Sequence, residues 1–581
     1  MIFSNFKLLF VLFCVAHVFS LSESLASVES TYAFRDAKSE SDYFSSIPVV
    51  LTATRLSQPV TVAPAAITVI TRQMIEASGA QEIGDLLRLV PGFQVGYFNG
   101  ISMSLSYHGF TGNYDRRLQV LIDGRSVYMP MLSTVEWLSL PLDISEVEKI
   151  EVVRGSNTPV YGANSFRGVI NIITRKSFQD LGAKIETTIG SFNLSKLENA
   201  ISHGQKRQTL DNLDSRKVIA QYANAFEQFD YRLTLGYQQD HGFDEVKDSK
   251  ELSLAHFVFN YQLDSYNTLG LQLGTRIGDM DTFASGSADD PHRKKDIQSN
   301  YQSLTWNRSL GSDRAFELRF YHNYYEHDDE YILGKVSELL GEPPKEAVPE
   351  AIQPYFDDNI KQGIYFGVAE RFDLELQYTF SPVSGLRVVS GGGARLDRMQ
   401  SSHLLNRSKY ITDKSVRAYT NLEWYAMRAL VVNAGIMFEN NQQTDLYYSP
   451  RLALNLILND ENVLRLALTR AFRAPSILEN NVDLAVRLPN RQPLARIHYS
   501  AKNLNAEKLD AAEFGYLYHS QDQRISFDSK VFMEKFVTVF WKLKTIQLRV
   551  SPGCGIITLV QMSMVSKINC HYAPIGDYYL L

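Results

Sequence analysis

Apolar and polar residues alternate along many segments of this chain from about residue 180 onward. The segments 231–238, 316–321, 451–458 and 464–469 each place an apolar side chain at every second position. Because successive side chains of a β-strand point to opposite faces, this period predicts strands with one apolar and one polar face. Such an apolar face turns inward in a soluble sandwich and outward, toward lipid, in a membrane barrel. The alternation alone leaves both structures open.

The N-terminus indicates export from the cytoplasm. Lys7 precedes an almost wholly apolar run, 8–19, which is too short to span a bilayer as a helix. We expect a signal peptide over residues 1–26 with cleavage after Ala26, and Ser20 is the alternative cleavage position. Since no later apolar run is long enough for a membrane helix, the exported chain is either soluble or a barrel. The export signal, the many alternating segments and the long polar connections favour the barrel.

Composition and motifs exclude several functional classes. The net charge is −6 and the charges are mixed, so no basic surface predicts a nucleic-acid partner. The three cysteines are Cys14, Cys554 and Cys570, so the long body between them does not depend on disulfides. The chain has no GxSxG or HExxH motif and no clustered metal ligands, so we expect no catalytic residues, no metal and no cofactor. A periplasmic β-rich enzyme is the disfavoured alternative.

Residues 47–176 read as a compact α/β domain that follows a polar, aperiodic leader at 27–46. The leader is predicted to be flexible and to lie in the periplasm. The segment from Ile47 to Ala53 is extended, and Pro48 suits an edge or free strand because it cannot donate a ladder hydrogen bond.

Local signals predict the elements of this domain. Thr71 can cap a short helix that Gly79 ends. Residues 83–90 carry apolar side chains at helical spacing, which predicts a second helix. Asp123 and Gly124 predict a tight hairpin, because both central residues of a type I′ turn need positive φ.

Seven short sequences in this domain resemble the plug of TonB-dependent receptors, and they occur in the family's order and spacing. They are 49–55, 65–71, 86–92, 120–125, 150–155, 161–165 and 168–174. The region after the plug resembles the family's barrel at 448–451, 471–476, 503–508 and 513–516. The resemblance covers residues 47 to about 535.

This resemblance implies a mainly β protein, with an N-terminal α/β plug domain inside a transmembrane antiparallel β-barrel in the outer membrane of a Gram-negative bacterium. It implies active uptake of a scarce nutrient, first of all a ferric siderophore, with haem or cobalamin as the alternatives. The partner TonB, driven by the inner-membrane proton-motive force, would pair with an extended segment by strand addition. In this chain the TonB-binding segment would consist of Ile47, Pro48, Val49, Val50, Leu51, Thr52 and Ala53.

The resemblance also suggests how the plug is attached to the barrel wall. Arg154 matches a plug arginine, and Glu513 matches a lumen-facing glutamate that would pair with it. His108 stands where the family commonly has a second arginine, which would make the attachment sensitive to pH. If the ligand is haem, His498 and His108 are the candidate iron ligands.

The C-terminal region departs from the family. The alternation fades beyond about Phe536, and the tail 537–581 reads as atypical or frameshifted. The family's roughly 22 strands need roughly 440 residues, whereas the partial barrel at 177–536 holds about 16 to 18 strands. We therefore expect that C-terminal strands are missing and that this chain is a receptor product that does not transport. The alternative is a smaller barrel with an unusual closing segment.

Overall fold

A computed structural model gives the positions of most of the chain. The described residues are 49–107, 116–132, 134–190, 215–242, 248–282, 292–311, 313–500, 502–520, 525–538, 543–550, 557–563, 571–572 and 577–580. The predicted signal peptide and leader lie outside these ranges, as do Ile47, Pro48 and His108.

The plug domain is built around a five-stranded sheet with the order β3-β8-β9-β6-β7. Its β6 and β9 are parallel, and the other neighbours are antiparallel. The elements of this domain are β1 (Val49–Val50), β2 (Gln58–Pro59), η1 (Val60–Val62), β3 (Ala66–Thr71), α3 (Arg72–Ser78), η2 (Ile83–Leu89), β4 (Phe93–Asn99), β5 (Ser102–Tyr107), β6 (Leu118–Ile122), β7 (Arg125–Ser126), η3 (Trp137–Ser139), η4 (Ile144–Glu146), β8 (Val147–Arg154), α4 (Thr158–Tyr161), β9 (Gly168–Thr174) and η5 (Ser177–Gln179).

The core of the plug lies between this sheet and the helical segments α3 and η2. Apolar side chains of both layers are fully buried there, and β-branched residues dominate the strands, as their propensity favours. The most buried members are Ile70, Leu86, Leu87, Val147, Ile150, Val152, Ile170 and Ile172. This core holds the plug strands in position, and the polar side chains that contact the large sheet extend from these strands.

Local sequence signals set the boundaries of these elements. The Thr71 hydroxyl accepts a hydrogen bond from the Met74 amide at 3.4 Å, and Gly79 ends α3 in the left-handed region with φ 68°. Asp123 and Gly124 have φ values of 49° and 82°, as the predicted hairpin requires. The second predicted helix is a run of 3-10 turns, η2. The spacing of its apolar residues therefore predicted the buried face correctly but not the helix type.

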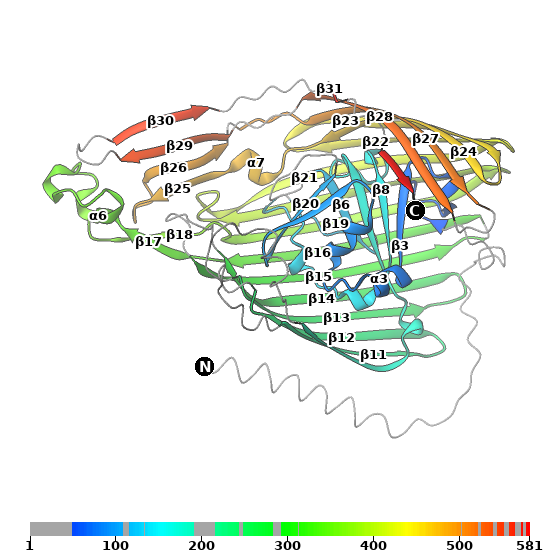
Figure 1. Cartoon of the computed structure of the whole chain (residues 1–581), viewed down its shortest axis with the longest axis horizontal. Helices are drawn as coiled ribbons and strands as arrows, with labels where there is room; N and C mark the ends of the chain where they lie inside the picture. Colours follow the sequence, from blue (N-terminus) through cyan, green and yellow to red (C-terminus); the bar gives the residue numbers. More distant parts are fainter. Residues whose placement is uncertain are drawn as a thin grey trace, which may run out of the picture. The chain divides into compact units, whose positions relative to one another are not determined.

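The second part of the chain is a single antiparallel sheet in which nearly all neighbouring strands are consecutive in sequence (Figure 1). Its strands are β10 (Gly182–Gly190), β11 (Ser215–Ala225), β12 (Phe229–Asp240), β13 (Lys250–Gln262), β14 (Asn267–Thr282), β15 (Arg293–Ser309), β16 (Arg314–Asp328), β19 (Gly367–Val383), β20 (Leu386–Ser401), β21 (Arg407–Met427), β22 (Leu430–Asn441), β23 (Thr444–Asn459), β24 (Asn462–Arg473), β27 (Glu507–His519), β28 (Ser526–Thr538), β31 (His571–Tyr572) and β32 (Asp577–Leu580). The predicted mainly β fold with an α/β plug is confirmed.

Side-chain exposure and contacts with the plug show which face of this sheet points inward. Leu452 and Leu466 are 44% and 42% exposed, whereas Ala453 and Asn455, between the exposed positions, are fully buried. The Asn455 side-chain amide donates to the carbonyl oxygens of the plug residue Val62 and its neighbour. The polar face therefore covers the plug, and the apolar face points away from it, as in a membrane barrel.

The two ends of the sheet carry different connections. Short turns join β13 to β14, β19 to β20 and β23 to β24 at one end. Long connections, such as 329–366 and 474–506, lie at the other end. In outer-membrane barrels short turns face the periplasm and long loops face outward. The N-terminal plug segment lies at the short-turn end, where the Arg387 guanidinium donates to the Ser57 carbonyl at 2.8 Å.

The long connections form structure of their own (Figure 1). A two-stranded hairpin of β17 and β18 lies beside a four-stranded sheet with the order β25-β26-β29-β30. These elements are β17 (Tyr331–Lys335), α6 (Val336–Leu339), η7 (Lys345–Ala347), η8 (Gln353–Tyr355), β18 (Asn359–Gln362), α7 (Ile477–Asn481), β25 (Asp483–Arg487), β26 (Pro493–Ser500), β29 (Leu543–Val550) and β30 (Ile557–Ser563).

The large sheet does not close within the described ranges. It has 17 strands, and β10 at its first edge pairs with β11 alone. Fifteen of these strands, β10 to β28, precede residue 539, and the last two come from the 537–581 tail. On β10, Ile185 and Ile189 are 70% and 77% exposed, because they lie on the face that points away from the plug at an edge with no further described strand.

None of the helices in the described ranges has the length and apolar character needed to span a bilayer.

Candidate functional site

The first described segment of the chain is fixed to the plug by a buried carboxylate. Glu151 lies on β8 and is fully buried. Its Oε2 accepts hydrogen bonds from the amides of Leu51 and Thr52, both at 3.0 Å, and from the Thr52 hydroxyl at 2.6 Å. A carboxylate that receives three donors holds backbone and side chain together.

Three further side chains hold the same segment. The Asn157 amide donates to the Thr52 carbonyl, and the Asn171 amide donates to its hydroxyl, both at 3.1 Å. The Lys149 ammonium donates to the Val49 carbonyl at 3.0 Å. The strand β1 also pairs with β2, and Val50 is 1% exposed. The segment predicted to be an edge or free strand is therefore docked on the plug, because it buries Val50 and satisfies Glu151.

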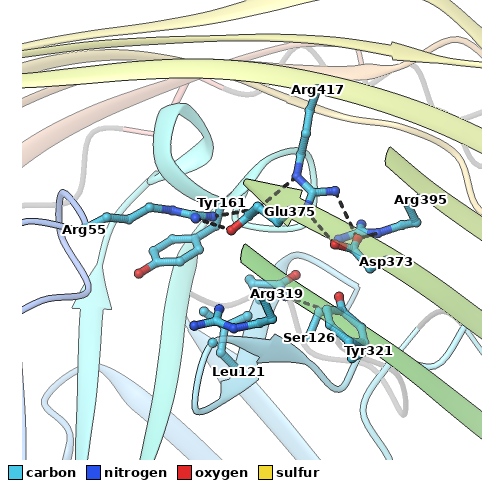
Figure 2. Close-up of a pocket in the computed structure, with 12 residues that line it drawn as sticks. Arg55, Leu121, Ser126, Tyr161, Arg319, Tyr321, Asp373, Glu375, Arg395 and Arg417 are labelled. Atoms are coloured by element: carbon cyan, nitrogen blue, oxygen red, sulfur yellow. Dashed lines mark hydrogen bonds and ion pairs between the residues drawn. The ribbon is translucent and has the colours of Figure 1, made fainter. Parts of the chain in front are cut away.

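Arg55 connects this segment to the barrel wall (Figure 2). Its guanidinium forms an ion pair with Glu375 on β19 and donates to the Tyr419 hydroxyl at 2.8 Å. Its Nε donates to the Val160 carbonyl of the plug at 3.0 Å, and the group lies 4.7 Å from the ring centroid of Tyr161. One side chain thus joins the N-terminal segment, the plug and the sheet.

The wall opposite Arg55 carries a chain of alternating charges (Figure 2). The Arg417 guanidinium bridges Asp373 at 2.8 Å and Glu375 at 2.7 Å. Arg395 pairs with the other side of Asp373 at 2.7 Å. These groups lie between plug and sheet and are nearly inaccessible to solvent, so each charge depends on its neighbours.

A separate buried network ties the plug to β12, β13 and β15. The Glu146 carboxylate accepts from the Thr234 hydroxyl at 2.9 Å and lies 2.7 Å from the His256 ring and 3.3 Å from Arg232. The other ring nitrogen of His256 lies 2.6 Å from the Tyr301 hydroxyl. Burial alone would raise the pKa of Glu146, but His256 and Arg232 outweigh it and lower the pKa to about 2.

At the long-loop end, the plug's apex is covered by apolar side chains. Met129 and Met131 of the plug are fully buried. They belong to one apolar cluster with side chains of the barrel strands and their outer connections, which include Tyr325, Ala369, Met399, Leu404, Leu405, Ile477 and Leu484. The plug therefore spans from the docked N-terminal segment at one end to this covered apex at the other.

Family models match both parts of this architecture. Residues 59–169 match the TonB-dependent receptor plug domain. Residues 188–535, more than half of the chain, match the TonB-dependent receptor-like β-barrel. The chain belongs to the TonB-dependent receptor family. The predicted family and outer-membrane location are confirmed, and the family is one of transport receptors rather than enzymes.

Curated relatives and solved structures agree with this assignment. The vitamin B12 transporter of Photobacterium profundum is 33% identical over 159 residues, which are 27% of this chain and 25% of that protein. The iron-regulated outer membrane virulence protein of Vibrio cholerae is 28% identical over 276 residues, 46% of this chain and 39% of that protein. The receptor thus spans well under half the length of the curated relatives it matches.

Two solved structures share the fold at low identity. The siderophore receptor of Acinetobacter baumannii has a TM-score of 0.60 at 14% identity, covering 85% of this chain and 74% of that one. A mutant ferric enterobactin receptor of Pseudomonas aeruginosa has a TM-score of 0.63 at 14% identity, covering 87% and 74%.

The predicted pair Arg154–Glu513 lies in one cluster of the receptor, but its closest contacts are with other partners. The Arg154 guanidinium is 2.6 Å from Asp528, and the Lys530 ammonium is 3.7 Å from Glu513. Lys530 also donates to the Arg154 carbonyl at 3.1 Å. The direct pairing of Arg154 with Glu513 stays a prediction, and Asp528 and Lys530 are the members that the motif comparison missed.

The receptor has two further plug attachments that sequence reasoning did not single out. Arg167 pairs with Glu534 at 3.0 Å, and both side chains are 4% exposed. Arg117 pairs with Glu507 at 2.9 Å, and Glu507 also binds Arg473. Both arginines stand beside plug strands that were predicted, but their partners are hundreds of residues away. The only sequence signal for either arginine was a charged residue next to an apolar strand. That pattern is equally typical of a strand end exposed to water.

The structure describes one of the two candidate histidines, His498. His108 lies outside the described residues. His498 lies on β26, opposite Leu484, and burial lowers its pKa. Its Nδ1 has no hydrogen-bond partner among the described residues. Within the described part of the chain, no group of three or more His, Cys, Asp or Glu side chains is placed to hold a metal ion.

Proposed function

We propose that this receptor, in a transport-competent version with a closed barrel, takes up a ferric siderophore actively across the outer membrane, with energy that TonB transmits from the inner membrane. The observation that carries the proposal is the arrangement of the plug. The described part of the proposed TonB-binding segment, Val49 to Ala53, is followed by Ser57 at the short-turn end of the sheet, and the apex of the plug lies at the long-loop end. A ligand bound outside and a partner bound inside would therefore act on opposite ends of one domain.

The docking of the N-terminal segment sets the condition for TonB binding. Strand addition needs backbone donors and acceptors that are free. The Leu51 and Thr52 amides are bound to Glu151, and the Thr52 carbonyl is bound to Asn157. TonB can pair with this stretch only after these contacts open, so ligand binding at the apex would act by favouring the open segment.

A ferric siderophore is proposed as the ligand because iron uptake recurs among the similar proteins. One curated relative is named for its iron regulation, and the two solved structures are titled as siderophore and ferric enterobactin receptors. These similarities support the ligand class only.

Uptake of radiolabelled ferric enterobactin into intact cells tests the proposal. We expect energised accumulation in cells that express a transport-competent version of the receptor with a closed barrel, and surface binding alone when TonB is absent. Equal accumulation with and without TonB would refute energy coupling. Absence of ferric siderophore binding would refute the ligand class.

Cobalamin is the second candidate, because the vitamin B12 transporter relative is 33% identical where it matches. Competition of cobalamin with ferric enterobactin for surface binding separates the two ligands. If cobalamin binds and ferric enterobactin does not, the ligand assignment changes while the TonB-dependent mechanism stands.

Haem is the third candidate and depends on His498. A neutral imidazole nitrogen without a partner is a suitable iron ligand. We expect the haem absorption spectrum to change between the receptor and its His498→Ala variant if His498 binds the iron. An unchanged spectrum and affinity would remove His498 from the site.

A further inference from the structure

A small cavity lies between the plug hairpin of β6 and β7 and the wall strands β16, β19, β20 and β21 (Figure 2). Its volume is about 20 Å³, which is room for one particle of the size of a water molecule. The hairpin comes this close to the wall because Gly124 has no side chain, and a Cβ atom there would overlap the Arg319 guanidinium. The cavity is therefore formed by the seating of the plug against the wall.

The side chains around this cavity carry more positive than negative charge. Arg55 and Arg395 each pair with one carboxylate, and Arg417 bridges both. Three guanidiniums therefore share two carboxylates, which leaves an excess of one positive charge in this group. The charged residues that line the cavity are four arginines and two acids, namely Arg55, Arg319, Arg395, Arg417, Asp373 and Glu375.

The carboxylates nearest to this lining are engaged elsewhere. Glu317 pairs with Arg319, the fourth lining arginine, at 2.6 Å, so these two charges cancel. Asp397 pairs with Arg371 at 2.7 Å, which is a second balanced pair. Glu439, on the neighbouring strand β22, accepts from a plug amide at 3.2 Å and forms no ion pair within the described ranges. The excess positive charge at the cavity therefore remains.

Two of the lining guanidiniums have donors that the described residues do not use. The Arg395 Nε donates to Asp373 at 2.7 Å, but its two Nη atoms have no hydrogen-bond partner in the described part of the chain. The Arg319 Nε is buried and likewise has no partner among those residues. Because buried N–H groups in proteins are nearly always paired, these donors need an acceptor in the cavity that both arginines line.

We propose that this cavity binds one monovalent anion of the size of chloride. The unused N–H groups of Arg319 and Arg395 donate to the anion from two neighbouring parts of the wall. Its charge neutralises the excess that the three guanidiniums and two carboxylates leave. A buried charge without a counterion is strongly unfavourable, so the anion stabilises the seated plug. The proposal does not depend on which ligand the receptor transports.

Size and charge select this occupant. A cavity of about 20 Å³ is too small for phosphate, a carboxylate or a metal chelate, each of which has several heavy atoms. The positive lining disfavours a metal cation. A water molecule fits and can accept hydrogen bonds, but it leaves the positive charge uncompensated. Water is therefore the outcome against which the anion is tested.

The count of charges also links the anion to the docked N-terminal segment. Arg55 supplies one of the three guanidiniums, and it follows the segment that Glu151 holds. If Arg55 moves away from the wall, two guanidiniums and two carboxylates remain, and the cavity no longer has an excess charge. By thermodynamic linkage, an anion that binds only the docked arrangement favours that arrangement.

Bromide diffraction of the full-length receptor locates the anion. Bromide is close to chloride in size and scatters X-rays anomalously. Crystals grown in sodium bromide should show one anomalous peak in the cavity, between Arg319 and Arg395. Density for a water molecule without an anomalous peak would overturn the proposal.

Thermal unfolding of the receptor in detergent gives a second readout. Sodium chloride and sodium bromide are compared with sodium gluconate at equal ionic strength, because gluconate is too large for the cavity. We expect chloride and bromide to raise the unfolding midpoint by about 2 °C at about a hundred-fold excess over the dissociation constant. Equal midpoints in all three salts would contradict the anion site.

Arg395→Met removes the excess charge and keeps a long unbranched side chain. The two carboxylates then have two guanidiniums, so the variant should be nearly as stable as the parent in gluconate. It should lose both the bromide peak and the difference between the salts. The diffraction test on the parent stays decisive if this variant does not fold.

Arg387→Met is the matched control on the same strand, because Arg387 pairs with Glu423 and does not line the cavity. This control should keep the bromide peak and the difference between the salts. A salt effect that survives in Arg395→Met, or one that disappears in Arg387→Met, would show that the anion does not bind in the cavity.

Hydrogen exchange of the Leu51 and Thr52 amides tests the link to the docked segment. Exchange in the parent should be at least about ten-fold slower in chloride than in gluconate, because the bound anion favours the docked segment. Arg395→Met should exchange equally in both salts. Equal exchange of the parent in the two salts would refute the link, whereas the bromide peak decides the site itself.

Discussion

The two ends of the plug are held in different ways. The N-terminal segment is held by directional contacts, in which Glu151 receives three donors and Arg55 joins the plug to Glu375. The apex around Met129 and Met131 is held by apolar contact with the outer connections. Hydrogen bonds and ion pairs fail when one partner moves by about an ångström, whereas apolar burial responds gradually to area. The N-terminal segment can therefore detach from the plug in one step, whereas the apex can adjust its apolar contacts gradually when a ligand binds.

Proline in the N-terminal segment should have the largest effect and should affect the inner end alone. Leu51→Pro removes the amide that donates to Glu151 in the docked segment, and either proline, Val50→Pro or Leu51→Pro, removes a donor that the TonB-bound strand would need. In a complete, transport-competent version of the receptor, we expect energised uptake to be abolished and surface binding of ligand to be unchanged. Uptake and binding are measured on the same cells, and Leu51→Ala serves as the control that keeps the donor. Uptake equal to the parent would contradict the proposed TonB segment.

Truncation of the apex should affect the outer end alone. Met131 is fully buried, so Met131→Ala should cost about 2–5 kcal/mol of local stability by leaving a cavity. We expect faster hydrogen exchange in the outer connections, with unchanged exchange at Thr52. Met131→Leu keeps the volume and is the matched control. Equal acceleration at both ends would show that the plug opens as one unit.

Acid should loosen the polar attachments but not the apex. The pKa of Glu146 is lowered to about 2 from its usual 4.5. Because the folded pKa is the lower one, the stabilisation is complete above about pH 4.5 and is lost as the pH falls toward 2. This loss is on the order of 3 kcal/mol.

Thermal unfolding of the receptor between pH 5 and pH 2.5 measures this effect. Glu146→Gln should be less stable than the parent at pH 5 and should show a flatter dependence on pH. Thr52→Val, which leaves Glu146 intact, should keep the slope of the parent. A parent whose stability does not change over this range would contradict the assigned charge of Glu146.

Removal of the Thr52 hydroxyl should have the smallest effect. Thr52→Val keeps the side-chain shape and removes two hydrogen bonds, one donated to Glu151 and one accepted from Asn171. The loss of the bond to the charged Glu151 costs about 1.5–3 kcal/mol. We expect a spin label at Ser57 to report a more mobile N-terminal segment without ligand. Glu151→Gln should act in the same direction. Unchanged mobility in both variants would show that the other contacts of the segment, such as those of Lys149, Asn157 and Arg55, are sufficient to hold it.

Local sequence signals predicted the fold well. The cap at Thr71, the stop at Gly79 and the turn at Asp123 and Gly124 each depend on residues within a few positions. The alternation of 451–458 likewise separated the two faces of its strand, and the contact of Asn455 with the plug decides which of them points inward. Each signal depends on the backbone preference or the polarity of single residues, and it needs no information about distant parts of the chain.

The contacts between plug and wall could not be predicted in the same way. Arg55 and Glu375 are 320 residues apart, and Thr52 and Glu151 are 99 apart. Their pairing depends on which strand of the sheet faces which part of the plug, and local periodicity does not contain that information. The family motifs placed Arg154 and Glu513 in one cluster but not its other members, Asp528 and Lys530.

The order of neighbours in the large sheet has a consequence for how the receptor reaches its native state. Nearly every strand pairs with the strand that follows it in sequence, so hairpins can form one after another with small losses of chain entropy. The pair of Arg167 and Glu534 joins residues 367 positions apart and needs most of that sheet in place. We expect folding to be sequential, with the hairpins fast and the seating of the plug as the slow last step.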